Sequence, residues 1–427
     1  MKRPYAPSSE SNRDIFTTFI APALDLPFPL SEYQSRVTRI REAMDAAQLE
    51  VLFLSAPESI CYATGYASEW YQTQATSHWP PTSGVAIHVD HDTPIHFESE
   101  QEKLLVQSTS ASADIRIHPS TASGRGDAWS WWTAAAIAEE LKSSGWLPGS
   151  VGLEMGSCRP NRIVSEQFQA SLETVGCKVV DATHIARSIR RLKSPQELVY
   201  IRTAQKIANV GLDAVKATLR PGVTELEVYG EMIAAMARVG GEISGIPLPV
   251  TSGLRTGSSH ALSSRKVVMP GDIVKVDICG VYCRYHANIA RDFSIGEPDP
   301  EVADRVSKAA GVFDVVASEI RPGLRVADLL PHIESYCREQ GIWEDRRYVG
   351  GYELGIAFPP DWVGEWIWGF DHDPGEDSLE PGLVANCESN FYLPDGWGSP
   401  TLIKTFAVTE RSASFLENGP AGLITIE

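Results

Sequence analysis

Two segments of this sequence share one pattern: a helix, an Arg-Pro-Gly turn and a second helix. The first helix begins after Ser194, which is expected to form a capping box with Glu197. Pro195 stands at the first helical position, where proline is favoured. Its turn is Arg220-Pro221-Gly222, and the same phrase recurs at Arg321-Pro322-Gly323. The repeat predicts two helical hairpins packed around a sheet.

The sequence before Ser194 has a different organisation. A segment with apolar residues at helical spacing, 32–49, is followed by short apolar runs typical of strands. These runs lie at 51–54, 84–89, 94–97 and 150–154. We therefore predict an α/β domain over residues 1–190 and a second domain over residues 191–427, which suits the length of 427 residues.

Composition excludes several classes of protein. The net charge of −18 disfavours nucleic-acid binding, and no apolar run has the roughly 18 residues of a membrane helix. The N-terminus lacks the apolar stretch of a secretory signal, and the seven cysteines are scattered rather than spaced as a disulfide framework. We expect a cytoplasmic protein with no membrane or nucleic-acid partner.

Motifs in the second domain carry a family resemblance. A buried strand at 274–280 holds Asp277, Asn288 follows eleven residues on, and Tyr352 stands in the loop Gly350-Gly351-Tyr352-Glu353-Leu354-Gly355. With Glu388 and Ile403, these positions resemble the five metal-ligand positions of the creatinase and aminopeptidase P family. The resemblance implies an α/β N-terminal domain and an α+β pita-bread catalytic domain with an internal pseudo-twofold repeat.

Only two of the five positions keep a metal-binding carboxylate, Asp277 and Glu388. Asparagine is a poor ligand, tyrosine binds these metals less readily than histidine, and isoleucine cannot bind them. We therefore predict no metal and no cofactor. Two alternatives stay open: a single ion near Asp277 and Glu388, or an insertion that brings Glu410 or Glu417 to the position of Ile403.

Within the family, the sequence is most similar to the non-metal branch that contains creatinase and ectoine hydrolase. The resembling stretches are 64–66, 252–260, 280–286, 351–355 and 358–362. This implies hydrolysis of a C–N bond in a small cationic cyclic amidine or guanidino acid. Asp277 is one methylene shorter than the glutamate expected in ectoine hydrolases, which leaves the exact substrate open.

Hydrolysis without a metal requires a general base or a protein nucleophile. Asp277 is the leading candidate for nucleophile, base or substrate clamp; the alternative is a buried salt bridge with Arg284 or Arg291. His260 matches the proton-transferring histidine of creatinase-like enzymes, and Glu388 could bind an amidinium through paired hydrogen bonds. Tyr352 could donate a hydroxyl group.

Further residues are candidates for substrate binding. Tyr285 and His286 could line the pocket wall, and Asp361 could supply a second anion. The resemblance implies a homodimer with its active site near the subunit interface, to which Trp70 and Tyr71 would contribute aromatic faces that attract cations. The alternative for each of these residues is ordinary packing.

Three functions are compatible with these motifs. The first is a metal-independent hydrolase of the ectoine hydrolase kind, or a creatinase-like amidinohydrolase. The second is a metal-dependent member, either a Xaa-Pro peptidase or a dimethylsulfoniopropionate lyase. The third is a non-catalytic binding protein, which the presence of His260, Asp277 and Glu388 disfavours.

Overall fold

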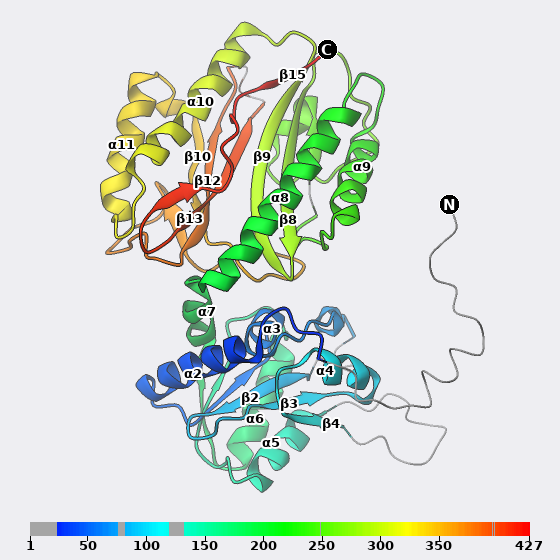
Figure 1. The fold of residues 1–427 in the computed structure, drawn as a ribbon, viewed down its shortest axis with the longest axis vertical. Coiled ribbons are helices and arrows are strands. Elements are labelled where there is room, and N and C mark those ends of the chain that lie inside the picture. Colours follow the sequence, from blue (N-terminus) through cyan, green and yellow to red (C-terminus); the bar gives the residue numbers. More distant parts are fainter. Residues whose placement is uncertain (1–23, 76–81, 119–131, 248, 395, 397) are drawn as a thin grey trace, which may run out of the picture. The chain divides into compact units, whose positions relative to one another are not determined.

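The structure is a computed structural model that describes residues 24–75, 82–118, 132–247, 249–394, 396 and 398–427. The chain divides into two compact units, Met1–Ala186 and Arg187–Glu427 (Figure 1). The division falls inside helix α7 (Thr183–Arg191), beside the predicted boundary at 190/191. Among the helices of the described residues, none is both long and apolar enough to cross a membrane.

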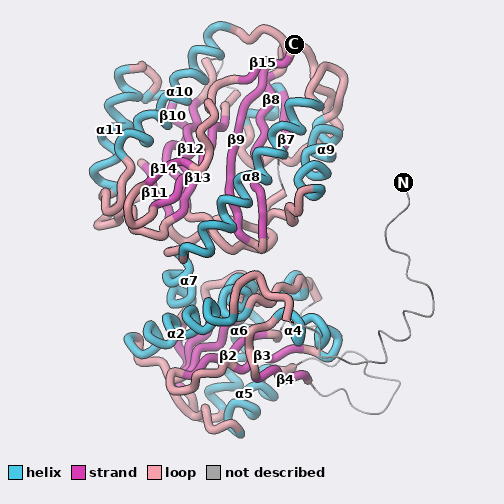
Figure 2. The backbone as a smooth tube through the Cα atoms, viewed as in Figure 1, coloured by secondary structure: helices cyan, strands magenta, loops and turns pink. Residues whose placement is uncertain are grey.

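The first unit is a six-stranded mixed sheet flanked by helices (Figure 2). Its order is β4-β3-β2-β1-β5-β6, with β1 antiparallel to β2 and parallel to β5. The strands are β1 (Val51–Leu54), β2 (Gly84–His88), β3 (Ile95–Glu98), β4 (Asp114–Ile117), β5 (Ser150–Leu153) and β6 (Lys178–Asp181). The helices besides α7 are α2 (Leu30–Ala46), α3 (Pro57–Thr64), α4 (Lys103–Thr109), α5 (Ala134–Ser143) and α6 (Arg162–Thr174). All four residues of β1 are buried, as a short apolar run in a sheet core requires.

The second unit is built on a nine-stranded sheet. Its main path is β11-β10-β12-β13-β9-β8-β7, with β14 added to β13 and β15 added to β9. The strands are β7 (Val250–Ser252), β8 (Ile273–Tyr282), β9 (Tyr285–Ile295), β10 (Arg346–Tyr352), β11 (Ile367–Gly369), β12 (Val384–Phe391), β13 (Thr401–Val408), β14 (Ala413–Phe415) and β15 (Ile424–Ile426). Every residue of β9 is buried, so this strand lies at the centre of the unit.

Two helical hairpins pack on this sheet and confirm the predicted repeat (Figure 1). Helices α8 (Pro195–Thr218) and α9 (Glu225–Arg238) cover the half that holds β8, and α10 (Pro300–Glu319) and α11 (Val326–Glu339) cover the half that holds β12. The capping box of α8 is present: the Ser194 backbone N–H donates to Glu197 at 2.8 Å, and the Glu197 N–H donates to the Ser194 hydroxyl at 3.3 Å. Gly222 and Gly323 have φ of +91° and +78°, which explains glycine at the same place in both turns.

Candidate active site

Strand register brings the predicted catalytic carboxylates into one row across the sheet. Asp277 on β8 pairs with Ala290 on β9, Ala290 pairs with Ile403 on β13, and Ile403 pairs with Glu388 on β12. Because side chains alternate along a strand, residues in such a row share one face of the sheet. The polar residues two positions away follow the same rule and frame the row. Those residues are Lys275, Asn288, Asp292, Asn386, Asn390, Thr401 and Thr405.

A chain of asparagine amides connects the two carboxylates. The backbone N–H of Tyr352 donates to Asn386 Oδ1 at 2.7 Å, which turns the Asn386 amide nitrogen toward Asn288 Oδ1 (3.3 Å) and Glu388 Oε1 (3.2 Å). Asn288 Nδ2 in turn donates to Asp277 Oδ1 at 2.6 Å. Since a backbone N–H can only donate, it fixes the orientation of every amide in the chain.

Glu388 receives a second amide, because Asn390 Nδ2 donates to its Oε2 at 2.9 Å. Both oxygens of this carboxylate are therefore held by neutral donors. Burial raises the pKa of Asp277 to about 6, and burial together with the charge of Asp277 raises the pKa of Glu388 to about 7. A cation bound between the two carboxylates would therefore favour the ionised form of both.

These carboxylates open into a cavity of about 370 Å³ in the second unit. Four predicted catalytic residues line it together: His260, Asp277, Tyr352 and Glu388. The other described residues in its wall are Ile246, Pro247, Pro249, Ser259, Ala261, Leu262, Arg347, Tyr348, Trp362, Val363, Asn390, Thr401 and Ile403. The Trp362 indole N–H donates to the Tyr352 hydroxyl at 3.0 Å, so the tyrosine is oriented by a second aromatic side chain.

Two cations hold the segment that leads to His260. Lys275 Nζ donates to the carbonyls of Thr256 (3.1 Å) and Ser258 (2.7 Å), and Arg347 Nη1 donates to the intervening carbonyl of Gly257 at 2.8 Å. Three successive carbonyls are thereby tied to strands β8 and β10. His260 itself is exposed and follows this anchored stretch at the cavity wall.

The structure places Tyr285, His286 and Asp361 outside the described residues that line the cavity. The Tyr285 hydroxyl donates to Glu197 on α8 at 2.8 Å. His286 accepts from the Gly245 N–H at Nε2 (3.0 Å) and lies 2.9 Å from the Arg284 carbonyl at Nδ1, so both ring nitrogens are engaged by backbone. Asp361 is exposed and accepts from the Val363 N–H at 3.0 Å. This arrangement does not support their predicted substrate contacts.

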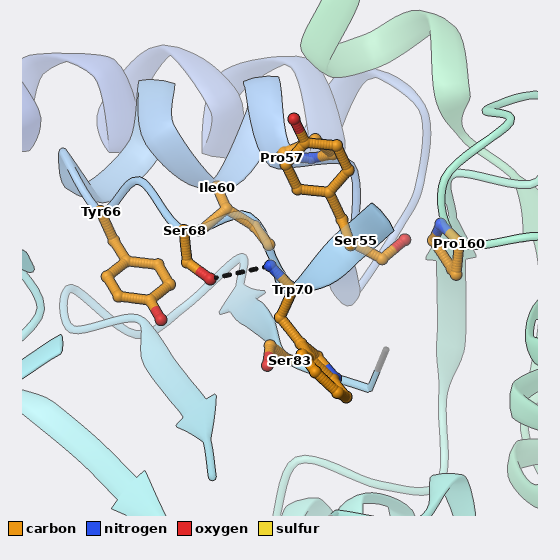
Figure 3. Close-up of a pocket in the computed structure, with 9 residues that line it drawn as sticks. Ser55, Pro57, Ile60, Tyr66, Ser68, Trp70, Ser83 and Pro160 are labelled. Atoms are coloured by element: carbon orange, nitrogen blue, oxygen red, sulfur yellow. Dashed lines mark hydrogen bonds between the residues drawn. The ribbon is translucent and has the colours of Figure 1, made fainter. Parts of the chain in front are cut away.

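Trp70 and Tyr71 lie in the first unit, in the short helix η1 (Trp70–Gln72). They line a small pocket there with Tyr66 and Ser83, and the Trp70 backbone N–H donates to the Ser68 hydroxyl at 3.2 Å (Figure 3). Their contribution to the catalytic cavity through a dimer stays a prediction.

The alternative interpretations of Asp277 and Ile403 receive no support. Arg291 pairs with Glu417, and Arg284 pairs with Glu242 at 3.5 Å, so neither arginine forms the salt bridge considered for Asp277. Arg291 also donates to the Ile403 carbonyl at 2.8 Å, and Ile403 pairs with Glu388 in the register. Ile403 therefore occupies the position assigned to it from sequence.

Asn288 was singled out from the sequence, but other polar residues around the carboxylates were missed, namely Asn386, Asn390, Lys275 and Arg347. The alternation Asn386-x-Glu388-x-Asn390 on β12 and Lys275-x-Asp277 on β8 was visible as a signal. Period-two spacing places such residues on one face of a strand, beside any functional carboxylate. Arg347 could not be found in this way, because its contact with the Gly257 carbonyl joins segments 90 residues apart.

Comparison with known proteins identifies the family. The Creatinase/Prolidase N-terminal domain matches residues 36–192, and Metallopeptidase family M24 matches residues 199–410. The chain belongs to the creatinase and aminopeptidase P family, with the two-domain pita-bread architecture, and is a hydrolase of family M24.

Individual relatives differ in their named activities. An uncharacterized hydrolase/peptidase of Sinorhizobium fredii is 26% identical over 404 residues, covering 93% of this chain and 98% of the relative. The ectoine hydrolase of Halomonas elongata is 24% identical over 434 residues, covering 94% and 98%. The solved structure of a Xaa-Pro dipeptidase from Bacillus anthracis superposes with a TM-score of 0.73 at 20% identity, covering 92% and 100%.

The side chains of this site do not fit the pair of divalent ions that the name of family M24 implies. In the described part of the chain, no group of three or more His, Cys, Asp or Glu side chains is arranged to hold a metal. Asn288 directs an N–H rather than a lone pair at Asp277, and Asn386 and Asn390 direct N–H groups at both oxygens of Glu388. Each of these donors takes one lone pair of a carboxylate oxygen, and the two carboxylates that remain are too few to neutralise and hold two divalent ions.

The raised pKa values predict a pH-dependent stability. Asp277 and Glu388 prefer the protonated form when folded, so they destabilise the fold as pH rises from about 4 through about 7. We expect the stability of Glu388→Gln relative to the wild type to rise by roughly 2 kcal/mol from pH 4 to pH 8, on top of a constant cost for the N–H group that glutamine turns toward Asn386 or Asn390. Urea unfolding across this pH range measures it, with the exposed Glu410→Gln as control. A difference that is constant with pH would contradict the prediction.

Proposed function

We propose that this protein is a metal-independent hydrolase that opens a C–N bond in a small cationic cyclic amidine, with ectoine as the leading substrate. One observation carries the proposal: Asp277 and Glu388 face a single cavity of about 370 Å³, and the hydrogen bonds they receive come from asparagine amides. Buried carboxylates held in this way attract an organic cation that can both neutralise them and donate hydrogen bonds.

The wall of the cavity suits such a cation. Tyr348, Tyr352 and Trp362 present aromatic groups, which attract organic cations by their electron-rich faces. The size of the cavity favours a small molecule over an extended peptide. In this proposal Glu388 clamps the amidinium N–H groups, and Asp277 supplies the second negative charge.

His260 would move the proton in this mechanism. A water molecule adds to the amidinium carbon and gives its proton to the imidazole, which then passes that proton to the leaving nitrogen as the C–N bond breaks. The Tyr352 hydroxyl accepts from Trp362 and interacts with Glu388, so it would hold the carboxylate that binds the cation. The carbonyls held by Lys275 and Arg347 support this role, because they restrain the segment that carries His260.

A second candidate function is hydrolysis of Xaa-Pro dipeptides. It is supported by the resemblance of the fold to a Xaa-Pro dipeptidase and by the name of family M24. Removal of metal distinguishes the two candidates. A dinuclear peptidase loses its activity when its metals are removed, whereas the proposed hydrolase keeps it.

The test is turnover by protein treated with EDTA and then freed of the chelator. We expect ring opening of ectoine, followed by NMR, at the same rate before and after treatment and after addition of Mn²⁺ or Zn²⁺. Creatine tests the amidinohydrolase alternative, and Ala-Pro tests the peptidase. Activity only on Ala-Pro, lost with EDTA and recovered with metal, would overturn the proposal in favour of the second candidate.

A further inference from the structure

A second, larger cavity lies on the other face of the same sheet. Its volume is about 710 Å³, and it is bounded by α10, by β13 and by the segment from Asn418 into β15. The polar side chains in its wall are Ser307, Asp314, Lys404, Asn418 and Thr425. None of these residues takes part in the proposed hydrolysis.

Lys404 is the unusual feature of this cavity. Its side chain is only 8% exposed, yet it lines the cavity. Within the described residues, its ammonium makes no hydrogen bond and has no carboxylate within 4.0 Å. It lies over the rings of Phe313 and Phe415, whose centroids are 5.7 and 5.5 Å from Nζ, and its charge interacts at longer range with Glu417 and Asp314.

Two aromatic rings compensate only part of the cost of burying an ammonium group. The nearby Glu417 is already paired with Arg291, which also donates to the carbonyls of Ala290 and Ile403. Consistent with incomplete compensation, burial lowers the pKa of Lys404. A buried cation at the wall of a polar cavity is therefore available to an anionic group from outside.

The cavity also carries one carboxylate near its opening. Asp314 lies on α10, one residue after Phe313, and is exposed. A ligand that reaches from the buried Lys404 to the exposed Asp314 would need a negative group at one end and a positive group at the other. Ser307, Asn418 and Thr425 add hydrogen-bonding groups to the same wall.

We propose that this cavity binds a small zwitterion of the amino-acid class, with its carboxylate on Lys404 Nζ and its amino group on Asp314. The site is separate from the catalytic cavity. Ile403 lines the catalytic cavity, and Lys404 is the next residue on the same strand, so their side chains project to opposite faces of the sheet. The proposal therefore does not depend on the proposed hydrolase activity.

Isothermal titration calorimetry with the standard L-amino acids tests this site, with acetate and methylammonium as probes that carry one charge each. We expect at least one amino acid to bind the wild type more tightly than either single-charge probe. Lys404→Met, which keeps the length and removes the charge, should weaken that binding at least tenfold, and Asp314→Asn should weaken it several-fold. Lys308→Met on α10 is the matched control, because this lysine pairs with Asp304 at 2.7 Å and lies outside the described lining.

Glu388→Gln shows in which of the two cavities the amino acid binds, because Glu388 lines only the catalytic cavity. Binding that survives this substitution, and is lost with Lys404→Met, supports the site. Unchanged binding by Lys404→Met, equal affinity for acetate and the amino acid, loss of binding with Glu388→Gln, or no binding by any amino acid would each overturn the proposal. If Lys404→Met fails to fold, the exposed Asp314→Asn decides, and retention of full affinity by that variant would refute the zwitterion.

Discussion

Substitution of Glu388 by glutamine is expected to lower kcat/KM for the cationic substrate by about a hundredfold to a thousandfold, the range typical for loss of one buried charge-stabilising group. Glutamine removes the negative charge and cannot satisfy the two amides that now donate to the carboxylate. Asn386 Nδ2 approaches Oε1 and Asn390 Nδ2 approaches Oε2, so one of them would meet an N–H group. The loss should be largest above pH 7, where Glu388 is ionised, and should shrink toward pH 6, where protonation removes the same charge from the wild type.

The matched control for this prediction is the next residue on β12. Ser389 points to the opposite face, where its hydroxyl donates to the Ala309 carbonyl at 2.7 Å. Ser389→Ala should cost about 1 kcal/mol of stability while leaving turnover within about twofold of the wild type. Steady-state kinetics and urea unfolding on both variants separate the two effects. Equal activity of Glu388→Gln and Ser389→Ala would show that the substrate does not lie against Glu388.

Features encoded locally could be predicted from the sequence. The capping box at Ser194 depends on residues three positions apart, and each Arg-Pro-Gly turn depends on one glycine with a positive φ. The metal-ligand positions were instead assigned from the family resemblance, and the register places Ile403 directly opposite Glu388.

Contacts that depend on strand register could not be predicted from the sequence. The link from Asn386 to Asn288 joins residues 98 apart and exists only because β12 and β9 flank the same strand. By contrast, alternation could have corrected the prediction for Tyr285. It lies three residues before Asn288 on β9, so the two side chains point to opposite faces.

His286 shows a different limit. It shares the face of Asn288, but its ring lies behind Trp362, with centroids 6.5 Å apart, and both nitrogens are bound to backbone. Burial also lowers the pKa of His286 to about 3, so it is neutral at physiological pH. Residue type and strand face were right for a substrate contact, and only the depth of the side chain excluded it.

The second large effect is expected when the missing metal ligands are restored. The triple variant Asn288→Asp, Tyr352→His, Ile403→Glu would add two carboxylates and a histidine to Asp277 and Glu388, because the register already places Asn288 and Ile403 beside them. Such a set neutralises and holds two divalent ions, whereas the native set does not. We expect the metal content after incubation with Mn²⁺ or Zn²⁺ and desalting to rise from near zero to about two ions per chain.

Metal bound only to the folded protein must also raise its unfolding temperature in proportion to the logarithm of metal concentration. Asn288→Asp alone is the control, since it adds one carboxylate and leaves Tyr352 and Ile403 in place; it should bind at most weakly. Bound metal ions would neutralise the carboxylates that the proposed cationic substrate needs. The metal-bound triple variant should therefore lose turnover of ectoine, while the metal-free wild type keeps it. A folded triple variant that takes up no metal would show that the five positions do not converge, whereas stoichiometric metal in the wild type would show that the native asparagines leave room for it.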